Sequence, residues 1–196
     1  MRRDIVVIKH LSNMVRSLIY ITILISTLIT ALGAISIARA GSTNVVDLNI
    51  DRYLGRWYEI ARLENPFERD LTCVTAHYTM QDNGQIEVVN RGYNTTTKEW
   101  SEARGRAKLT DESGRLRVSF FWIFFSDYNV LAVDDRCANY EWALVSGGRG
   151  GKYLWILART PSLNSDTLAY IERVAMARGY DIESLIYLDH SCDSTN

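Results

Sequence analysis

After residue 54 the sequence alternates short runs of apolar and β-branched residues with compact turn signals. The turns are rich in Gly, Asn and Asp, which tolerate the positive φ angles of tight hairpins. Eight such runs are typical of an antiparallel sheet that closes on itself, because closure leaves no edge strand unpaired. The sequence therefore predicts an all-β chain, an eight-stranded up-and-down barrel able to hold one small ligand. The expected strands are 55–63, 73–80, 85–93, 100–109, 115–120, 128–133, 140–146 and 153–159.

One segment near the C-terminus follows the period of a helix instead. Ser165 is its expected N-cap and Gly179 its expected stop. We expect this helix to pack outside the barrel and to cover strands with its apolar side. Residues 182–188 should return as a short helix or strand, and the long connection 64–71 is a candidate lid over one mouth. The apolar side of the helix consists of Leu168, Ile171, Val174 and Ala175.

Residues 1–40 have the pattern of a signal peptide. A basic lead-in precedes an apolar stretch, 18–37, and Ala38-Arg39-Ala40 offers a cleavage site before Gly41. An uncleaved N-terminal membrane anchor is the alternative, because about 20 apolar residues can span a bilayer. Met14 is an alternative start. The expected domain is 41–196, exported to the periplasm or associated with the outer membrane if the chain is bacterial, and no Cys near the leader's end is available for lipid attachment.

The charge of the expected domain excludes some partners. Subtracting the five basic residues and one acidic residue of 1–40 from the totals of 22 and 23 leaves 17 and 22, a net charge of −5. An acidic domain with scattered basic residues is not typical of a nucleic-acid-binding protein. We expect no nucleic acid as partner, and the same charge argues against an anionic membrane surface as the main partner.

Three cysteines remain: Cys73, Cys137 and Cys192. In an oxidising compartment one disulfide and one leftover thiol are expected. Pairing Cys73 with Cys192 would tie the C-terminal tail to an early strand, whereas Cys137 lies in a turn-like segment. There is no Cys-x-x-Cys or Cys/His cluster, so we expect no metal and no cofactor.

Three ordered blocks carry a resemblance to the lipocalin family. The first is Gly55-Arg56-Trp57-Tyr58-Glu59-Ile60-Ala61-Arg62, the second is Tyr128 to Asp134, and the third is Trp155-Ile156-Leu157-Ala158-Arg159-Thr160-Pro161. The chain resembles bacterial lipocalins of the outer-membrane lipoprotein type and the apolipoprotein D group, over about residues 46–189. The resemblance implies that Gly55, Trp57 and Arg159 form a structural signature, with Arg159 across the indole of Trp57 at a closed floor. It also implies a Cys73–Cys192 disulfide.

The resemblance further implies binding, storage or transport of a small hydrophobic ligand, typically a fatty acid or lysophospholipid. Strand alternation then places the pocket: if Cys73 faces outward, its alternate neighbours face inward. Asn90 is the polar residue among those expected to face inward, and a buried amide needs a hydrogen-bond partner, either water or a ligand head group. An anionic head group would lie at the mouth beside Arg62 or Arg69. The expected ligand-binding residues are Val74, Ala76, Tyr78, Val88, Asn90, Leu116, Val118, Phe120 and Trp155.

Five consecutive large apolar residues, 121–125, cannot all point into a barrel. We expect a loop near the open mouth that exposes an apolar patch for membrane contact or for a homodimer. The alternative is a strand buried under the helix.

Catalysis has little support in the sequence. The expected domain has two histidines, His77 and His190, and no nucleophile–base pair can be located. We expect no catalytic residues and no enzyme activity. Two alternatives remain: a lipocalin-fold enzyme acting on a lipid through Cys137, and an envelope interaction protein that uses the 121–125 patch and has a vestigial cavity.

Overall fold

The computed structural model describes residues 44–194. The predicted signal peptide or anchor, residues 1–40, lies outside the described residues. Within the described part of the chain no helix is long and apolar enough to cross a membrane.

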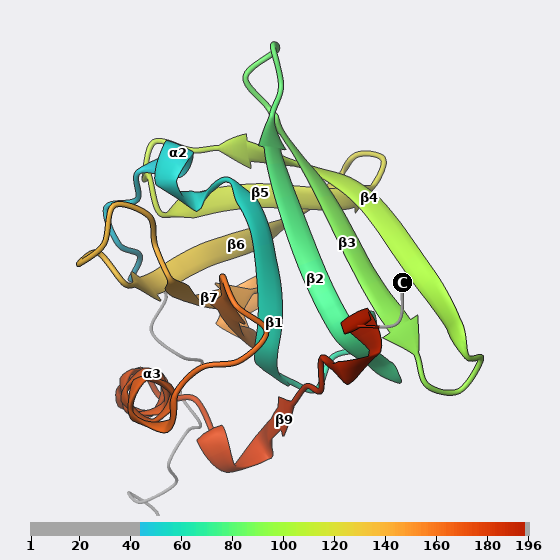
Figure 1. Ribbon diagram of the computed structural model, residues 1–196. Helices are drawn as coiled ribbons and strands as arrows, with labels where there is room; N and C mark the ends of the chain where they lie inside the picture. The colour runs from blue at the N-terminus through green and yellow to red at the C-terminus, as the bar shows by residue number, and fades with distance from the viewer. Residues whose placement is uncertain (1–43, 195–196) are drawn as a thin grey trace, which may run out of the picture. The chain divides into compact units, whose positions relative to one another are not determined.

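The strands form one antiparallel sheet that closes into an eight-stranded barrel (Figure 1). From the first strand to the eighth, each pairs with the next along the chain, and the first closes the ring by pairing with both the second and the eighth. The ninth strand pairs with the first, outside the ring. The predicted all-β barrel is confirmed. The strands are β1 (Gly55–Leu63), β2 (Leu71–Met80), β3 (Ile86–Asn94), β4 (Glu99–Leu109), β5 (Arg115–Phe121), β6 (Phe124–Val133), β7 (Trp142–Gly147), β8 (Tyr153–Ala158) and a short outer strand β9 (Leu185–Tyr187).

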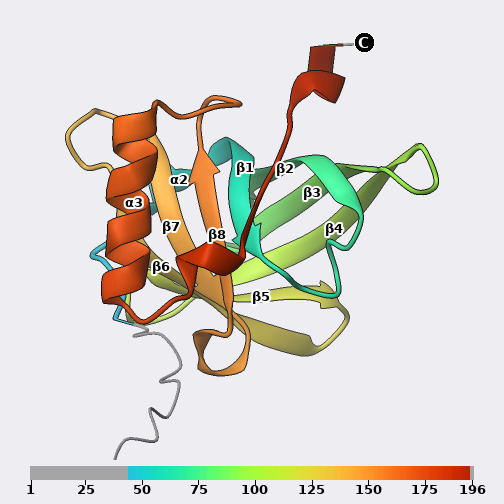
Figure 2. The same cartoon turned by 90° about the horizontal axis from the view of Figure 1, so that it is seen from below.

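Helix α3 (Ser165–Ala177) packs outside the barrel against β7 and β8 (Figure 2). Ile171 and Ala175 are fully buried there, in a cluster with outward-facing side chains of the barrel. The predicted N-cap was wrong by one residue: Asn164 is the cap, because its Oδ1 accepts a hydrogen bond from the Thr167 N–H at 2.8 Å. Gly179 follows the helix with φ 89°, which suits the left-handed end of a helix.

One end of the barrel is closed by α2 (Ile50–Tyr53) and by Arg159. The Arg159 guanidinium lies 3.8 Å from the centre of the Trp57 ring and donates hydrogen bonds to five backbone carbonyls. Gly55 has φ 94°, and a Cβ there would stand 3.4 Å from Arg159 Nη1. A glycine is therefore required where the chain turns under the arginine.

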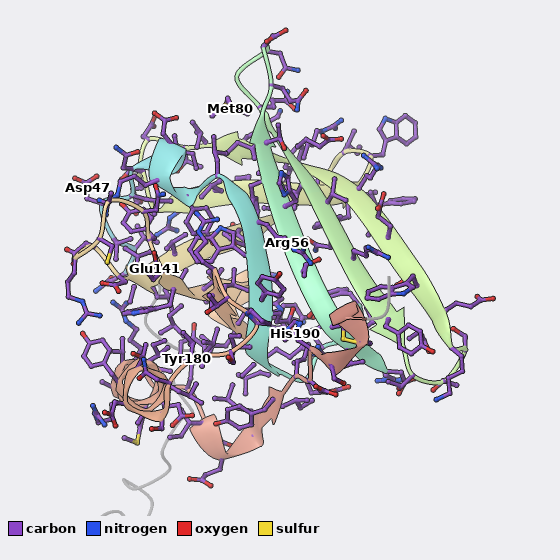
Figure 3. The ribbon with its side chains drawn as sticks, in the orientation of Figure 1. Asp47, Arg56, Met80, Glu141, Tyr180 and His190 are labelled. Atoms are coloured by element: carbon purple, nitrogen blue, oxygen red, sulfur yellow. A yellow bond between two sulfur atoms is a disulfide. The ribbon has the colours of Figure 1, made fainter. Side chains whose placement is uncertain are left out.

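The C-terminal tail fills the seam between β1 and β2 at the other end of the barrel. Leu188 N–H donates to the Ile60 carbonyl, and Cys73 N–H donates to the Asp189 carbonyl, each at 3.0 Å. The Cys73–Cys192 disulfide holds the tail there, as predicted, and Cys137 is an exposed free thiol. His190 in this tail and Met80 at the end of β2 mark the two ends of the barrel in Figure 3.

Candidate ligand-binding site

The closed half of the barrel is filled by its own side chains. The inward residues there include Trp57, Ile86 and Leu116, and none of these three is more than 1% exposed. Trp57 Nε1 donates to the Tyr53 carbonyl at 2.8 Å, so its polar atom is satisfied as well. This half is a packed core that supports the floor.

The open half differs, because inward-facing side chains there keep contact with solvent. In the barrel register Ala76, Asn90 and Ala103 stand side by side on β2, β3 and β4. Ala103 is exposed and the other two are partly exposed, as are Tyr128 and Trp155, which pack against the interior cluster from the facing wall. Solvent can reach these residues from the open mouth and from the place where the β4–β5 pairing ends, at Arg106 and Ser119, and we call this accessible inner region the hollow.

The structure places most of the predicted pocket residues on the inner face. Ala76 and Trp155 border the hollow, whereas Tyr78, Val88, Leu116 and Val118 belong to the buried interior cluster below it. Val74 follows a bulge in β2, and its Cγ2 lies 3.2 Å from where a Cβ on Gly92 would be. Phe120 is 43% exposed and lies over Gly105, so it belongs to the rim of the mouth.

A bulge in β1 changes which side chains face inward. Glu59 pairs with Leu157 but Ala61 pairs with Ile156, so Ile60 and Ala61 both face outward. Arg62, opposite Trp155, is therefore inside, whereas uninterrupted alternation would put it outside. The expectation that Arg62 anchors a head group at the mouth was wrong: the side chain is only 3% exposed and lies within the wall of the barrel.

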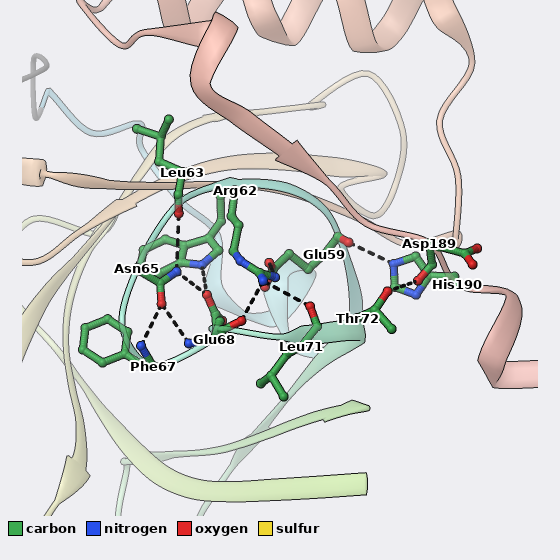
Figure 4. Close-up of polar contacts among 11 residues, drawn as sticks. Glu59, Arg62, Leu63, Asn65, Phe67, Glu68, Leu71, Thr72, Asp189 and His190 are labelled. Atoms are coloured by element: carbon green, nitrogen blue, oxygen red, sulfur yellow. Dashed lines mark hydrogen bonds and ion pairs between the residues drawn. The ribbon is translucent and has the colours of Figure 1, made fainter. Parts of the chain in front are cut away.

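The partners of Arg62 form a buried polar cluster beneath the β1–β2 connection (Figure 4). Its guanidinium donates to Glu59 Oε1 at 2.8 Å and to the carbonyls of Glu68 and Leu71. Glu68 belongs to the predicted lid and reaches inward, where its Oε2 accepts hydrogen bonds from Trp155 Nε1 at 2.9 Å and from Asn65 Nδ2. The lid is thus folded into the barrel wall and joined to the tryptophan of the hollow.

Two carboxyl groups share this cluster with a single guanidinium. Burial, followed by the charge of Glu68, raises the pKa of Glu59 well above its ordinary value, and Arg62 offsets only part of this. A carboxyl group in such a place tends to hold a proton when folded.

A pH-dependent stability follows from the raised pKa of Glu59. The folded state binds the proton more tightly, so the free energy of unfolding should fall as pH rises above about 4.3, the ordinary pKa of an unfolded Glu, through the raised value. Glu59→Gln keeps an oxygen for Arg62 and cannot ionise. Urea denaturation at several pH values gives the free energy of unfolding of both proteins. We expect the difference to shift in favour of the variant from acid to neutral pH. A difference that did not change with pH would contradict a protonated Glu59.

Polar atoms also occur deeper in the barrel. The hydroxyl of Tyr128 lies 2.6 Å from that of Tyr53 and 2.8 Å from that of Tyr78, and burial raises the pKa of all three phenols. Asn90 Oδ1 is buried and accepts no hydrogen bond from the described residues. The barrel interior therefore contains one buried acceptor without a partner among the described residues and a chain of three linked hydroxyl groups.

Sequence reasoning missed several residues of this site. Glu59 and Tyr128 could have been found. Glu59 is two residues after Trp57 and so lies on the same face of the strand, and Tyr128 begins the second family block. Glu68 and Asn65 lie in an irregular connection, where no periodicity indicates which side chain turns inward.

Comparison with known proteins agrees with this architecture. A family model described as a lipocalin-like domain matches residues 46–190. The chain is a lipocalin. It is 43% identical over 146 residues to the outer membrane lipoprotein Blc of Vibrio cholerae, covering 74% of this chain and 84% of that protein. It is 41% identical to the Escherichia coli Blc, with 76% and 82% covered, and 30% identical to mouse apolipoprotein D, with 74% and 78% covered.

Solved structures share the fold of this lipocalin at lower identity. The cockroach allergen Per a 4 superposes with a TM-score of 0.64 at 21% identity, covering 79% of this chain and 96% of the allergen. Insecticyanin from the tobacco hornworm gives a TM-score of 0.61 at 20% identity, covering 75% and 83%.

Proposed function

We propose that this lipocalin binds, stores or transports a single-chain lipid, such as a fatty acid or a lysophospholipid, within the cell envelope. The observation that carries the proposal is the contrast between the two halves of the barrel: the closed half is filled, and the inner face of the open half remains accessible. Lipocalins bind small hydrophobic ligands, and the relatives from Vibrio cholerae and Escherichia coli are named as outer membrane lipoproteins.

The charges of the hollow suggest how such a ligand lies. The Arg62 guanidinium is occupied by Glu59 and by two carbonyls, and the carboxylate of Glu68 beside it makes the inner wall unfavourable for a carboxylate or phosphate. The acyl chain therefore goes in first and the head group stays at the mouth. There the Arg69 side chain is exposed and lies 3.6 Å from Glu64. A hydroxyl near the head could reach the free Asn90 Oδ1.

The expected affinity is moderate. Burial of about eight methylenes contributes about 6 kcal/mol, at about 0.8 kcal/mol each. Association costs several kcal/mol, offset by the remaining contacts, so binding is expected in the micromolar range.

Trp155→Ala tests the location of the ligand. Trp155 borders the hollow, so the variant should bind a fluorescent fatty acid about tenfold more weakly, equivalent to the loss of about 1.4 kcal/mol of aromatic contact. Trp100→Ala is the matched control, since Trp100 stacks on Arg91 and lies outside the inner register. Trp155→Phe keeps the ring but loses the hydrogen bond to Glu68, which separates contact from lid anchoring. Equal affinities in Trp155→Ala and the wild type would place the ligand elsewhere.

An enzymatic role through Cys137 finds no specific support in the described residues. The thiol is exposed in the β6–β7 connection, and Arg52 Nη2 holds its carbonyl beside the floor, at the end opposite the mouth. Alkylation of Cys137 should leave lipid binding unchanged, and a lipid turnover that alkylation abolished would favour the enzyme.

A further inference from the structure

The β5–β6 hairpin ends in an exposed aromatic tip, defined as Phe121, Trp122, Ile123 and Phe124. The four side chains are 73%, 79%, 66% and 68% exposed. The predicted exposed patch is confirmed for four of its five residues, since Phe125 is only partly exposed. The loop is shorter than expected: Phe121 and Phe124 form the last pair of the hairpin, and only Trp122 and Ile123 turn between the strands. The two phenylalanine rings stack, with centres 6.3 Å apart.

The backbone of the tip is anchored, which keeps its side chains pointing outward. Arg106 Nη2 donates to the Trp122 carbonyl at 2.5 Å, and the buried Ser119 hydroxyl donates to the same oxygen at 3.3 Å. Arg117 Nη2 donates to the Phe125 carbonyl at 2.9 Å. An apolar surface held in this way suits contact with another apolar phase more than local packing.

Basic side chains lie directly behind the tip. Arg104, Arg106 and Lys108 alternate along the outer face of β4, and Arg117 faces Lys108 from β5. Arg104 pairs with Glu87 and Glu102, and Arg117 pairs with Asp127. Arg106 and Lys108 form no ion pair among the described residues; instead their cations lie 5.5 and 4.8 Å from the centre of the Phe125 ring. An otherwise acidic domain thus places uncompensated positive charge beside its most apolar surface.

A shallow pocket of about 250 Å³, largely open to solvent, lies at the foot of the tip. It lies where β4 and β5 part, since their pairing ends at Arg106 and Ser119. Two guanidinium groups, a hydroxyl and two aromatic rings surround it. Guanidinium groups bind phosphate oxygens in a two-pronged geometry, and the rings suit the adjoining glycerol and acyl carbons. The lining residues are Arg104, Gly105, Arg106, Ser119, Phe120 and Trp122.

We propose that the aromatic tip inserts into the surface of a bilayer containing anionic phospholipid, and that the pocket beneath it takes the phosphate of one lipid head group. Aromatic side chains beside basic ones are the combination that binds such interfaces. Tryptophan in particular settles at the level of the head groups. The β5–β6 hairpin belongs to the open end of the barrel, so docking brings the mouth to the membrane. This membrane contact does not depend on which ligand fills the hollow.

Fluorescence quenching by brominated lipids tests the proposal on the purified exported protein. The vesicles contain phosphatidylethanolamine with roughly a quarter phosphatidylglycerol, matched to vesicles of phosphatidylcholine alone. Wild-type emission should be quenched on the anionic vesicles, and Trp122→Phe, which keeps the apolar bulk, should lose most of that quenching while still binding. Equal quenching in the wild type and in Trp122→Phe would overturn the insertion of the tip. The comparison holds with or without the N-terminal segment, because both proteins share it.

Charge variants test the phosphate pocket. Arg104→Gln with Arg106→Gln should weaken partitioning onto anionic vesicles by about 30-fold, from about 1 kcal/mol for each basic residue. The single variant Arg104→Gln, which spares the contact of Arg106 with the tip backbone, should weaken it about fivefold. Arg173→Gln and Met176→Ser are matched controls, since both residues are exposed on α3. Equal loss in the controls, or equal binding to phosphatidylcholine, would overturn the pocket. If millimolar inorganic phosphate displaced the protein from the vesicles and the tip substitutions left vesicle binding unchanged, the pocket would be a site for free phosphate instead.

A second copy of the chain is the other occupant that this surface could take. Native mass spectrometry of the wild type and of Trp122→Ser with Ile123→Ser separates the two. A dimer that the substitutions dissociate, together with no quenching on vesicles, would overturn the membrane proposal in favour of a homodimer.

Discussion

Arg159→Met should lower the stability of the barrel by about 3 kcal/mol and its melting temperature by about 6–12 °C. The methionine fills similar space but leaves without a partner the carbonyls of Arg52, Tyr53, Leu54, Arg56 and Tyr140 that Arg159 binds at 2.8–3.2 Å. It also removes the cation above Trp57. Circular dichroism during heating measures the effect.

Arg159→Lys is the matched control for the charge alone. Lysine keeps the cation near the ring but cannot present the guanidinium fork to several carbonyls at once, so an intermediate loss is expected. A melt of Arg159→Met that overlays the wild type would contradict the role of the arginine in closing the floor.

Loss of the Cys73–Cys192 disulfide should have an effect of similar or larger size. The two cysteines are 119 residues apart, and closing a loop of that length is worth about 4–5 kcal/mol in the chain-entropy treatment, with strain reducing it. The double variant Cys73→Ala, Cys192→Ala should therefore melt at least about 8 °C lower. Because the tail also fills the seam at the mouth, fatty-acid binding should weaken in the same variant.

Cys137→Ala serves as the control, because this thiol is exposed and unpaired. It should melt and bind like the wild type. If the double variant did so as well, the hydrogen bonds of the tail would suffice to hold it, and the disulfide would be dispensable.

Much of the barrel could be predicted because each turn carries its own signal. Gly84 has φ 76°, which explains why its position in the sequence marks a hairpin, and β1 has the bounds expected from Gly55 to Leu63. Strand alternation also placed Ala76, Asn90 and Trp155 on the inner face. Period-2 patterning works wherever the ladder is uninterrupted.

The misplaced residues lie where the ladder is interrupted or absent. The β1 bulge reverses the side of the sheet on which Arg62 lies. Ile60 and Ala61 are ordinary strand residues, so the local sequence does not predict the bulge. Glu68 turns inward from a connection whose shape depends on Asn65 in the same connection, on Arg62 in β1 and on Trp155 in the distant strand β8. Such tertiary contacts decide the polar part of the site, so only its apolar part was accessible from patterning.

The position of the C-terminal tail has a consequence for how the barrel wall responds to reducing conditions. Leu188 and Asp189 bond to both β1 and β2, so a segment from far along the sequence completes the wall beside the mouth. The disulfide between Cys73 and Cys192 ties that segment to β2. We expect reduction of this bond to loosen the tail and to widen the mouth on that side, so that the redox state of the surroundings controls access to the interior.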